Sequence, residues 1–544
     1  QLVRYSDLGS YDPICFWLKG ILNFVSRHLK TYSLDCPPNL PLPPMPLLRF
    51  LLFCVISLSA AAATDMRRPN ILWIFAEDLS PYMGCYGDPI NAEYTPTIDN
   101  FAAQGVLFTR AFSTAPVCSA SRSAIITGVM QTSNGTHQHR SSRTTDGVIV
   151  PEELRIHLPD GMKTLPEMMR AAGYFTFNSG KDDYNFHYDR GDLYSVGNED
   201  TYKPGMNGWQ GNHAKHNLSI TEDTWNSRPD KSQPWFGQIE IKGGKANSRW
   251  VRPGQELADE EVPLPPYFPD TEAHRKAWTQ HYNAVRGSDA RVETIMNQLK
   301  SDGELENTIV FFFSDHGNNQ SLRHKQFCYE GGVHIPLMVK GNHPAIGSGI
   351  VRDELVSALD ITATTLALGD AEMPDHLDGY DLFSDTYPER SYMISARDRC
   401  DYTIDQIRTV RTDRYRYIRN GYPDRAMLQA QYRDNHPTVA DLKRLYDAGE
   451  LSPYLAEHWF GERPREEFYD LTTDPHQIHN LAADPAFETE VVRHRAILDT
   501  WIQETGDQGQ TQEAAVQLKA TYDLWIEREI FSEAKVNPEY DQFR

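Results

Sequence analysis

Two apolar segments that end abruptly in polar residues set the strongest limit on the fold of this chain. Residues 71–75 read ILWIF and run into Glu77-Asp78, and residues 307–313 read NTIVFFF and run into Ser314-Asp315-His316. Short continuous apolar runs are typical of strands buried on both faces of a parallel sheet, which deliver charge at their carboxyl ends. Adjacent carboxylates repel each other, so Glu77-Asp78 indicates a hard cation such as calcium or magnesium. A solvated acidic turn is the alternative for this segment alone.

Alternating runs of this kind extend over most of the chain. From residue 69 to about 385, apolar runs alternate with helical stretches such as 271–300 and 355–368. This rhythm predicts an α/β domain, a large, mixed, mostly parallel sheet with helices on both faces. From about residue 390, residues 407–412 and 415–418 alternate like antiparallel strands. We therefore expect a smaller C-terminal α+β subdomain with an antiparallel sheet over residues 386–544.

Cys118 opens the run Cys118-Ser119-Ala120-Ser121-Arg122, between a Ser/Thr/Ala/Pro loop at 113–117 and an apparent helix start at 124–128. A thiol at such a junction lies near amide donors and beside Arg122. That electropositive setting suits an activated nucleophile or a bound anion. A small buried cysteine without a chemical role is the alternative.

Taken together, these segments resemble the formylglycine-dependent sulfatases of the alkaline phosphatase-like superfamily, over residues 69–483. The resemblance implies that Cys118 is oxidised by a formylglycine-generating maturation enzyme, and that Arg122 steadies the resulting nucleophile. Ala120 stands where the family usually has proline, which leaves open which maturation enzyme accepts the sequence. The family also implies an alkaline phosphatase-like fold, with residues 69–385 as its catalytic domain.

The same resemblance implies a metal site. Its ligands would be Glu77, Asp78, Asp315 and His316, together with the modified Cys118. Glutamate at position 77 departs from the usual aspartate but also supplies a carboxylate oxygen. Oxygen-rich ligands favour one Ca²⁺ per chain, with Mg²⁺ also possible.

Two lysines are expected to bind sulfate. Residues 323–337 and the turn Ser179-Gly180-Lys181 match family segments, which assigns this role to Lys325 and Lys181. Either lysine alone would read as a solvated surface charge.

The proton donor is left open. Asp183 stands where the family often has histidine, and the strand at 234–241 leads to Lys245 where a histidine is usual. Lys245, His137 and His139 are the candidates, and a structural or substrate-contact role for the two histidines is equally open.

These features predict a sulfuric ester or sulfamate hydrolase acting on a sulfated glycan. Residues 134–139 and 263–289 look similar to N-sulfoglucosamine sulfohydrolase-like members, which leaves O-sulfate and N-sulfate both open. The charge-dense residues 397–401 read either as a surface ion-pair cluster or as part of a sugar-reading rim. The alternatives are a phosphate or phosphonate monoester hydrolase of the same superfamily, or a non-catalytic secreted glycan-binding protein.

Composition and the N-terminal region complete the expectation. The net charge of -22 argues against nucleic acid as a partner, although a local cationic pocket still suits an anionic substrate. Residues 45–63 read as a signal peptide, which predicts export to the periplasm or the extracellular space. Their apolar core is too short for a stable membrane span. Residues 1–44 read as an upstream extension, not a domain, and the oligomeric state is left open.

Overall fold

The computed structural model describes residues 3–4, 68–140, 152–196, 224–245, 250–526 and 537–543. The chain divides into two units, Gln1–Arg68 and Pro69–Arg544. The first unit contains one described element, the short strand β1 (Val3–Arg4). The predicted signal peptide at 45–63, and the predicted extension apart from β1, lie outside the described residues. Across the described part of the chain, no helix combines the length and the apolar character that a membrane span requires.

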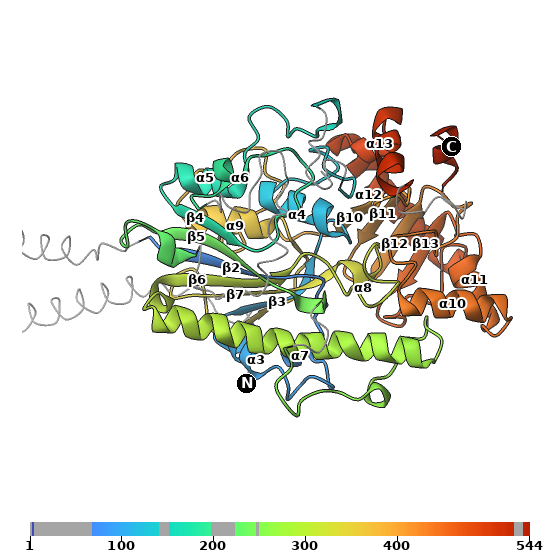
Figure 1. The fold of residues 1–544 in the computed structure, drawn as a ribbon, viewed down its shortest axis with the longest axis horizontal. Helices are drawn as coiled ribbons and strands as arrows, with labels where there is room; N and C mark the ends of the chain where they lie inside the picture. Colours follow the sequence, from blue (N-terminus) through green and yellow to red (C-terminus); the bar gives the residue numbers. More distant parts are fainter. Residues whose placement is uncertain are drawn as a thin grey trace, which may run out of the picture. The chain divides into compact units, whose positions relative to one another are not determined.

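A large mixed sheet forms the centre of the second unit (Figure 1). In sheet order its strands are β8 (Ile350–Arg352), β3 (Val106–Phe112), β7 (His334–Lys340), β6 (Thr308–Ser314), β2 (Asn70–Ala76), β5 (Trp235–Ile241) and β4 (Phe175–Ser179), with β9 (Val356–Ser357) beside β3. The neighbours β4, β5, β2 and β6 are parallel, whereas β7 runs antiparallel to both β6 and β3. The predicted mixed, mostly parallel sheet is confirmed.

Helices cover both faces of this sheet, which explains why every residue of β2 and β6 is buried. Ile71, Trp73 and Phe75 of β2 pack with side chains of α4 (Cys118–Thr127), α5 (Leu165–Ala171) and α9 (Asp360–Leu368). The alternate residues of β2 pack against α3 (Pro96–Ala103) and α7 (Glu272–Ser301) on the opposite face. Figure 1 shows these two layers on either side of the strands.

Of the two predicted helices, α7 matches the prediction of 271–300 to within a residue, and the Thr271 side chain caps its first turn. The prediction of a helix over 355–368 is wrong at its start. Val356 and Ser357 pair with β3 as β9, and α9 begins only at Asp360. The backbone groups at 356–357 bond to the sheet, so they are not available to a helix.

A second, antiparallel sheet follows, in the order β10 (Met393–Arg397), β11 (Ile407–Arg411), β12 (Tyr415–Asn420) and β13 (Glu466–Asp470). Its strands β11 and β12 confirm the predicted hairpin. One face packs on α12 (Glu488–Thr505) through Val410, Tyr417 and Phe468. The remaining helices are α6 (Arg190–Leu193), α8 (Glu330–Val333), α10 (Pro437–Asp447), α11 (Pro453–Phe460) and α13 (Ala515–Ile526). The predicted domain boundary at residue 385 stays a prediction.

Candidate active site

The carboxyl ends of four parallel strands meet at one edge of the large sheet and carry the charged side chains of the site. Glu77 and Asp78 follow β2, Asp315 and His316 follow β6, Lys181 follows β4 and Lys245 follows β5. Cys118 is the first residue of α4. The buried apolar strands thus place polar groups at the edge of an open α/β sheet where ligands bind.

Cys118 is fully buried among charged groups. Its Sγ lies 3.2 Å from Lys325 Nζ, 3.3 Å from His316 Nε2 and 3.6 Å from Asp78 Oδ1. Burial opposes ionisation, but Lys181, Lys325, Lys245 and His316 together hold the pKa of the Cys118 thiol well below its usual value. The surrounding cations therefore stabilise negative charge on the side chain of residue 118.

Four ligand-type side chains converge here: Asp78, Cys118, Asp315 and His316. Their donor atoms all lie within 4.8 Å of one another, and all four residues are buried. Asp78 Oδ1 is 3.1 Å from His316 Nε2, and the Asp78 amide donates to Asp315 Oδ1 at 2.9 Å. Two buried carboxylates and an imidazole at this spacing fit a divalent cation.

Glu77, the fifth predicted ligand, contacts lysines. Lys181 Nζ donates to Glu77 Oε1 at 2.5 Å, and Lys245 Nζ forms an ion pair with the same oxygen. Lys245 Nζ also lies 3.7 Å from Asp78 Oδ2. The structure therefore brings the predicted lysines and the predicted metal ligands into one cluster. Within it, Glu77 contacts the lysines rather than the other predicted ligands.

Arg122, on the helix that begins at Cys118, is held by the carboxyl groups of two residues. Its Nε lies 3.1 Å from Asp315 Oδ2, its NH1 lies 3.1 Å from Glu240 Oε2, and its guanidinium stacks on Phe75 at 4.3 Å. Glu240, on β5, also accepts a hydrogen bond from the Lys181 amide at 3.0 Å. Sequence reasoning missed Glu240. The available signal was a single acidic residue within the otherwise uncharged strand WFGQIEI.

Asp183, which stands where the resemblance suggests histidine, is buried and forms ion pairs with two cationic side chains. Its Oδ2 lies 3.0 Å from Lys181 Nζ, and both its oxygens accept from Arg140 at 3.2 Å. Burial opposes its charge, but Arg140 and Lys181 hold the pKa of the Asp183 carboxyl well below its usual value. Asp183 therefore acts as a fixed anion between two cations.

The predicted proton donors occupy different places. Lys245 lies within the cluster, and its side chain keeps 28% of its surface exposed. His139 Nδ1 lies 3.2 Å from Asp401 Oδ2 and 3.4 Å from Cys400 Sγ. His137 is half-buried and belongs to neither of the two metal-type ligand groups found among the described residues. Lys245 is thus the candidate that contacts the ligand carboxylates directly.

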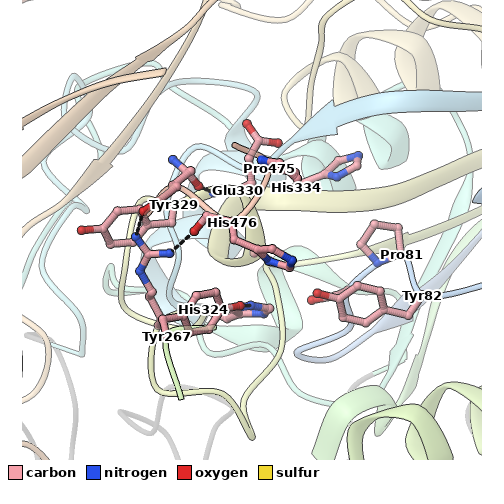
Figure 2. Close-up of a pocket in the computed structure, with 13 residues that line it drawn as sticks. Pro81, Tyr82, Tyr267, His324, Tyr329, Glu330, His334, Pro475 and His476 are labelled. Atoms are coloured by element: carbon pink, nitrogen blue, oxygen red, sulfur yellow. Dashed lines mark hydrogen bonds between the residues drawn. The ribbon is translucent and has the colours of Figure 1, made fainter. Parts of the chain in front are cut away.

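The segment that carries Lys325 has a second side. Whereas Lys325 Nζ donates to Asp78 Oδ2 at 2.9 Å, its neighbour His324 lines a separate cavity of about 220 Å³. Figure 2 shows His324, His476 and Tyr82 gathered around this cavity, and Tyr267 OH pairs with His324 Nε2 at 2.9 Å. The described residues that line it do not include Cys118 or the other metal-type ligands, so this cavity is distinct from that cluster.

The fold and the site together define a protein of the α/β class, in which a buried cysteine lies in a cluster of metal-type ligands at the edge of the large sheet. The sulfatase family model matches residues 69–371. The chain belongs to the sulfatase family, within the alkaline phosphatase-like superfamily, and the protein is a sulfatase. The predicted family is confirmed.

Relatives with known activities support this assignment. An ulvan-active sulfatase of Formosa agariphila is 30% identical over 485 residues, which cover 84% of this chain and 79% of the relative. Human N-sulphoglucosamine sulphohydrolase is 25% identical over 500 residues, which cover 84% of this chain and 94% of the relative. These similarities support hydrolysis of sulfate esters or sulfamates.

Solved structures confirm the fold. A 2-O GAG sulfatase matches with a TM-score of 0.55 at 20% identity, covering 82% of this chain and 94% of that structure. The phosphonate monoester hydrolase of Agrobacterium radiobacter matches with a TM-score of 0.55 at 17% identity, covering 80% of this chain and 96% of that structure.

Proposed function

We propose that this sulfatase releases inorganic sulfate from a sulfated glycan. The reaction would use a formylglycine, formed by oxidation of Cys118, and one bound divalent cation, Ca²⁺ or Mg²⁺. The observation that carries the proposal is the position of Cys118 Sγ, buried within 3.6 Å of Asp78, His316 and Lys325 at once. A nucleophile, metal-type ligands and a fixed cation thus share one point in space. The similarity to an ulvan-active sulfatase and to N-sulphoglucosamine sulphohydrolase supports a glycan substrate.

Asp78, Asp315 and His316 would hold the cation beside residue 118, with Glu77 as an additional carboxylate. When bound, the cation and the formylglycine hydrate supply a polarised sulfate and a nucleophilic oxygen. The other residues act through position and charge. Lys325 and Lys181 bind sulfate oxygens, and Arg122 ties α4 to Asp315 one turn beyond Cys118. Cations fixed in advance around developing negative charge lower the barrier without further reorganisation.

Lys245 is the proposed proton donor to the leaving oxygen. It follows β5, where the family resemblance places a histidine, and its ammonium group contacts Glu77 and Asp78. Burial opposes its charge, but these two carboxylates raise the pKa of the Lys245 ammonium above its usual value. The group therefore enters the reaction protonated, and a sugar alkoxide is basic enough to take its proton.

The first experiment is mass spectrometry of the peptide that contains Cys118, in protein made in its own host or together with a formylglycine-generating enzyme. Conversion lowers the peptide mass by about 18 Da, in place of the mass gains of ordinary cysteine oxidation. The same preparation is then assayed for sulfate release and for hydrolysis of matched phosphate and phosphonate esters.

Conversion together with faster sulfate than phosphate release supports the proposal. An unmodified thiol and tight binding without turnover would point to a glycan-binding protein. Faster phosphate or phosphonate turnover would point to the phosphohydrolase alternative. Export, expected from residues 45–63, is also a proposal, and it is tested by fractionating the host cells.

A further inference from the structure

Beside the nucleophile lies a cluster of ion pairs that the proposed reaction does not use. We call His139, Arg140, Asp183 and Asp401 the Arg140 cluster. Arg140 makes a two-pronged contact with Asp183 at 3.2 Å, and its NH1 lies 4.0 Å from Asp401 Oδ1. Asp401 in turn pairs with His139 Nδ1 at 3.2 Å. The cluster joins the segment after α4, the turn after β4 and the second sheet's edge segment at 398–403.

Both ends of the cluster adjoin the proposed sulfate site. The Arg140 amide donates to Ser119 Oγ at 3.0 Å, one residue from Cys118. Asp183 Oδ2 lies 3.0 Å from Lys181 Nζ, a proposed sulfate ligand. The Arg140 side chain is 13% exposed, whereas the side chains of His139, Asp183 and Asp401 are at most 3% exposed. Arg140 is therefore the member that a bound molecule reaches first.

The backbone in this region adopts an uncommon conformation. Arg140, Asp183 and Asp401 have positive φ angles of 61°, 53° and 48°. Asp78 and Gln326, which flank the nucleophile, share this left-handed conformation at 55° and 77°. Non-glycine residues rarely adopt it, and strained residues of this kind concentrate at active sites and ligand-binding segments. The same backbone conformation is thus shared by the proposed metal ligand Asp78 and by three members of the Arg140 cluster.

We propose that the Arg140 cluster is a binding subsite for the ring hydroxyl groups of the sugar that carries the scissile sulfate. This inference rests on the proposed function. The charges in the cluster alternate in sign from Lys181 through Asp183 and Arg140 to Asp401 and His139. A hydroxyl group both donates and accepts, so it matches alternating carboxylates and cations.

The cluster also gives a function to two sequence features. Asp401 belongs to the charge-dense segment 397–401, for which a surface ion-pair cluster and a sugar-reading rim were both open. Its side chain is 3% exposed, so it is not a surface ion pair. Asp183 replaces the histidine that the family resemblance suggests, and it orients Arg140 toward the sulfate-binding lysine.

The test compares sulfated sugars with sulfate esters that lack ring hydroxyls. The sugar substrates are the sulfamate N-sulfoglucosamine and the sulfate ester 6-O-sulfated N-acetylgalactosamine. Cyclohexyl sulfate has an alkoxide leaving group, like the 6-O-sulfated sugar, but no ring hydroxyls, and 4-nitrophenyl sulfate reports the sulfate site alone. The variants are Arg140→Lys, which keeps the charge but loses the two-pronged contact, and Asp401→Asn, which keeps the shape. Arg110→Lys is the matched control, since Arg110 pairs with Asp413 on the surface.

We expect both cluster variants to lower kcat/KM for the preferred sulfated sugar by about tenfold or more, mainly through KM, because a charged hydrogen-bond partner of the hydroxyls is lost. Activity on cyclohexyl sulfate and 4-nitrophenyl sulfate should stay within about twofold of the wild type. Arg110→Lys should change neither. Removal of one ring hydroxyl from the substrate should lower kcat/KM by a larger factor for the wild type than for the variants.

Equal losses on all substrates would show a purely structural role, and equal activities would show no role, so either result overturns the proposal. Wild-type enzyme that cleaves aryl sulfate but no sulfated sugar also overturns it. A larger loss on a sugar with a second sulfate or a carboxylate than on its neutral counterpart would replace hydroxyl recognition with anion recognition. If no sulfate ester is hydrolysed by the converted enzyme, the proposed function itself fails, which is a separate result.

Discussion

At the scale of single residues, the active centre is a balance of buried charges. The carboxylates of Glu77, Asp78, Glu240 and Asp315 interleave with the cations of Arg122, Lys181, Lys245 and Lys325. A buried charge without a partner costs several kcal/mol, so each member helps to hold its neighbours in place. The removal of one member therefore affects groups that it does not replace chemically.

Glu240 provides the first prediction at this scale. Glu240→Ala removes the acceptor shared by Arg122 and the Lys181 amide, which leaves the Arg122 charge partly uncompensated. We expect it to lower kcat by about tenfold or more and the free energy of unfolding by about 3 kcal/mol. Glu240→Gln keeps an acceptor oxygen and should retain more of both. Chemical denaturation and sulfate-release kinetics measure the two effects, and a wild-type-like alanine variant would contradict the assignment.

Lys245 provides the second prediction. If its ammonium protonates the leaving oxygen, Lys245→Ala should lower kcat for the hydrolysis of sulfated sugars by about a hundredfold, within the usual range for general acids. The loss should be much smaller with 4-nitrophenyl sulfate, because nitrophenolate leaves without a proton. His139→Gln should not reproduce this difference between leaving groups. The reverse pattern, with His139→Gln selective for basic leaving groups, would transfer the role to His139.

At the scale of elements, the sequence predicts which residues follow the strands, but it does not predict which strands are neighbours in the sheet. Apolar runs followed by charge predicted β2 and β6 and the residues after them. The ion pairs of Glu77 with Lys181 and Lys245 join residues 104 and 168 positions apart, so they depend on strand order. Glu240 was missed because one charge in a strand reads as an edge residue. The Arg140 cluster was missed because it draws on three separate segments.

The turn after β5 gives an element-scale prediction. Gly244 packs so closely on the β2 end that an added Cβ would lie 2.0 Å from the Asp78 carbonyl oxygen. Gly244→Ala must therefore push Lys245 and Asp78 apart. We expect at least a tenfold loss of kcat/KM and a lower melting temperature. Gly161→Ala is the control, because nothing lies within 4 Å of its added carbon and only its positive φ is strained. Equal effects of the two substitutions would show that the packing of Gly244 is not critical.

At the scale of the whole molecule, the C-terminal sheet and its loops support the segment that carries Lys325. Arg433 NH2 donates to the Lys325 carbonyl at 3.0 Å, Arg416 NH1 donates to the Cys328 carbonyl at 3.1 Å, and Arg323 bonds the carbonyls of His476 and Gln477. Together these arginines tie the second sheet and its loops to the segment that carries Lys325.

A buried, neutral histidine on α7 makes the stability of the molecule depend on pH. His281, on α7, is fully buried against Tyr82, and burial lowers the pKa of its imidazole to about 3. An unfolded histidine has a pKa of about 6.5. Below that pH the unfolded chain binds a proton at this residue that the folded chain does not bind. The contribution of His281 to stability is therefore present above about pH 6.5 and is lost as the pH falls toward 3.

The substitution His281→Leu removes this proton uptake. Each unit of pH between the two pKa values changes the free energy of unfolding by about 1.4 kcal/mol for one group. Between pH 6.5 and pH 5, the wild type should therefore lose about 2 kcal/mol more stability than the variant, measured by urea denaturation at each pH. Thr279→Val, on the same helix and equally buried, carries no titratable group and should keep the wild-type slope. Parallel curves for wild type and His281→Leu would mean that His281 takes up its proton in the folded state, and the packing of α7 against the loop after β2 would then open to water.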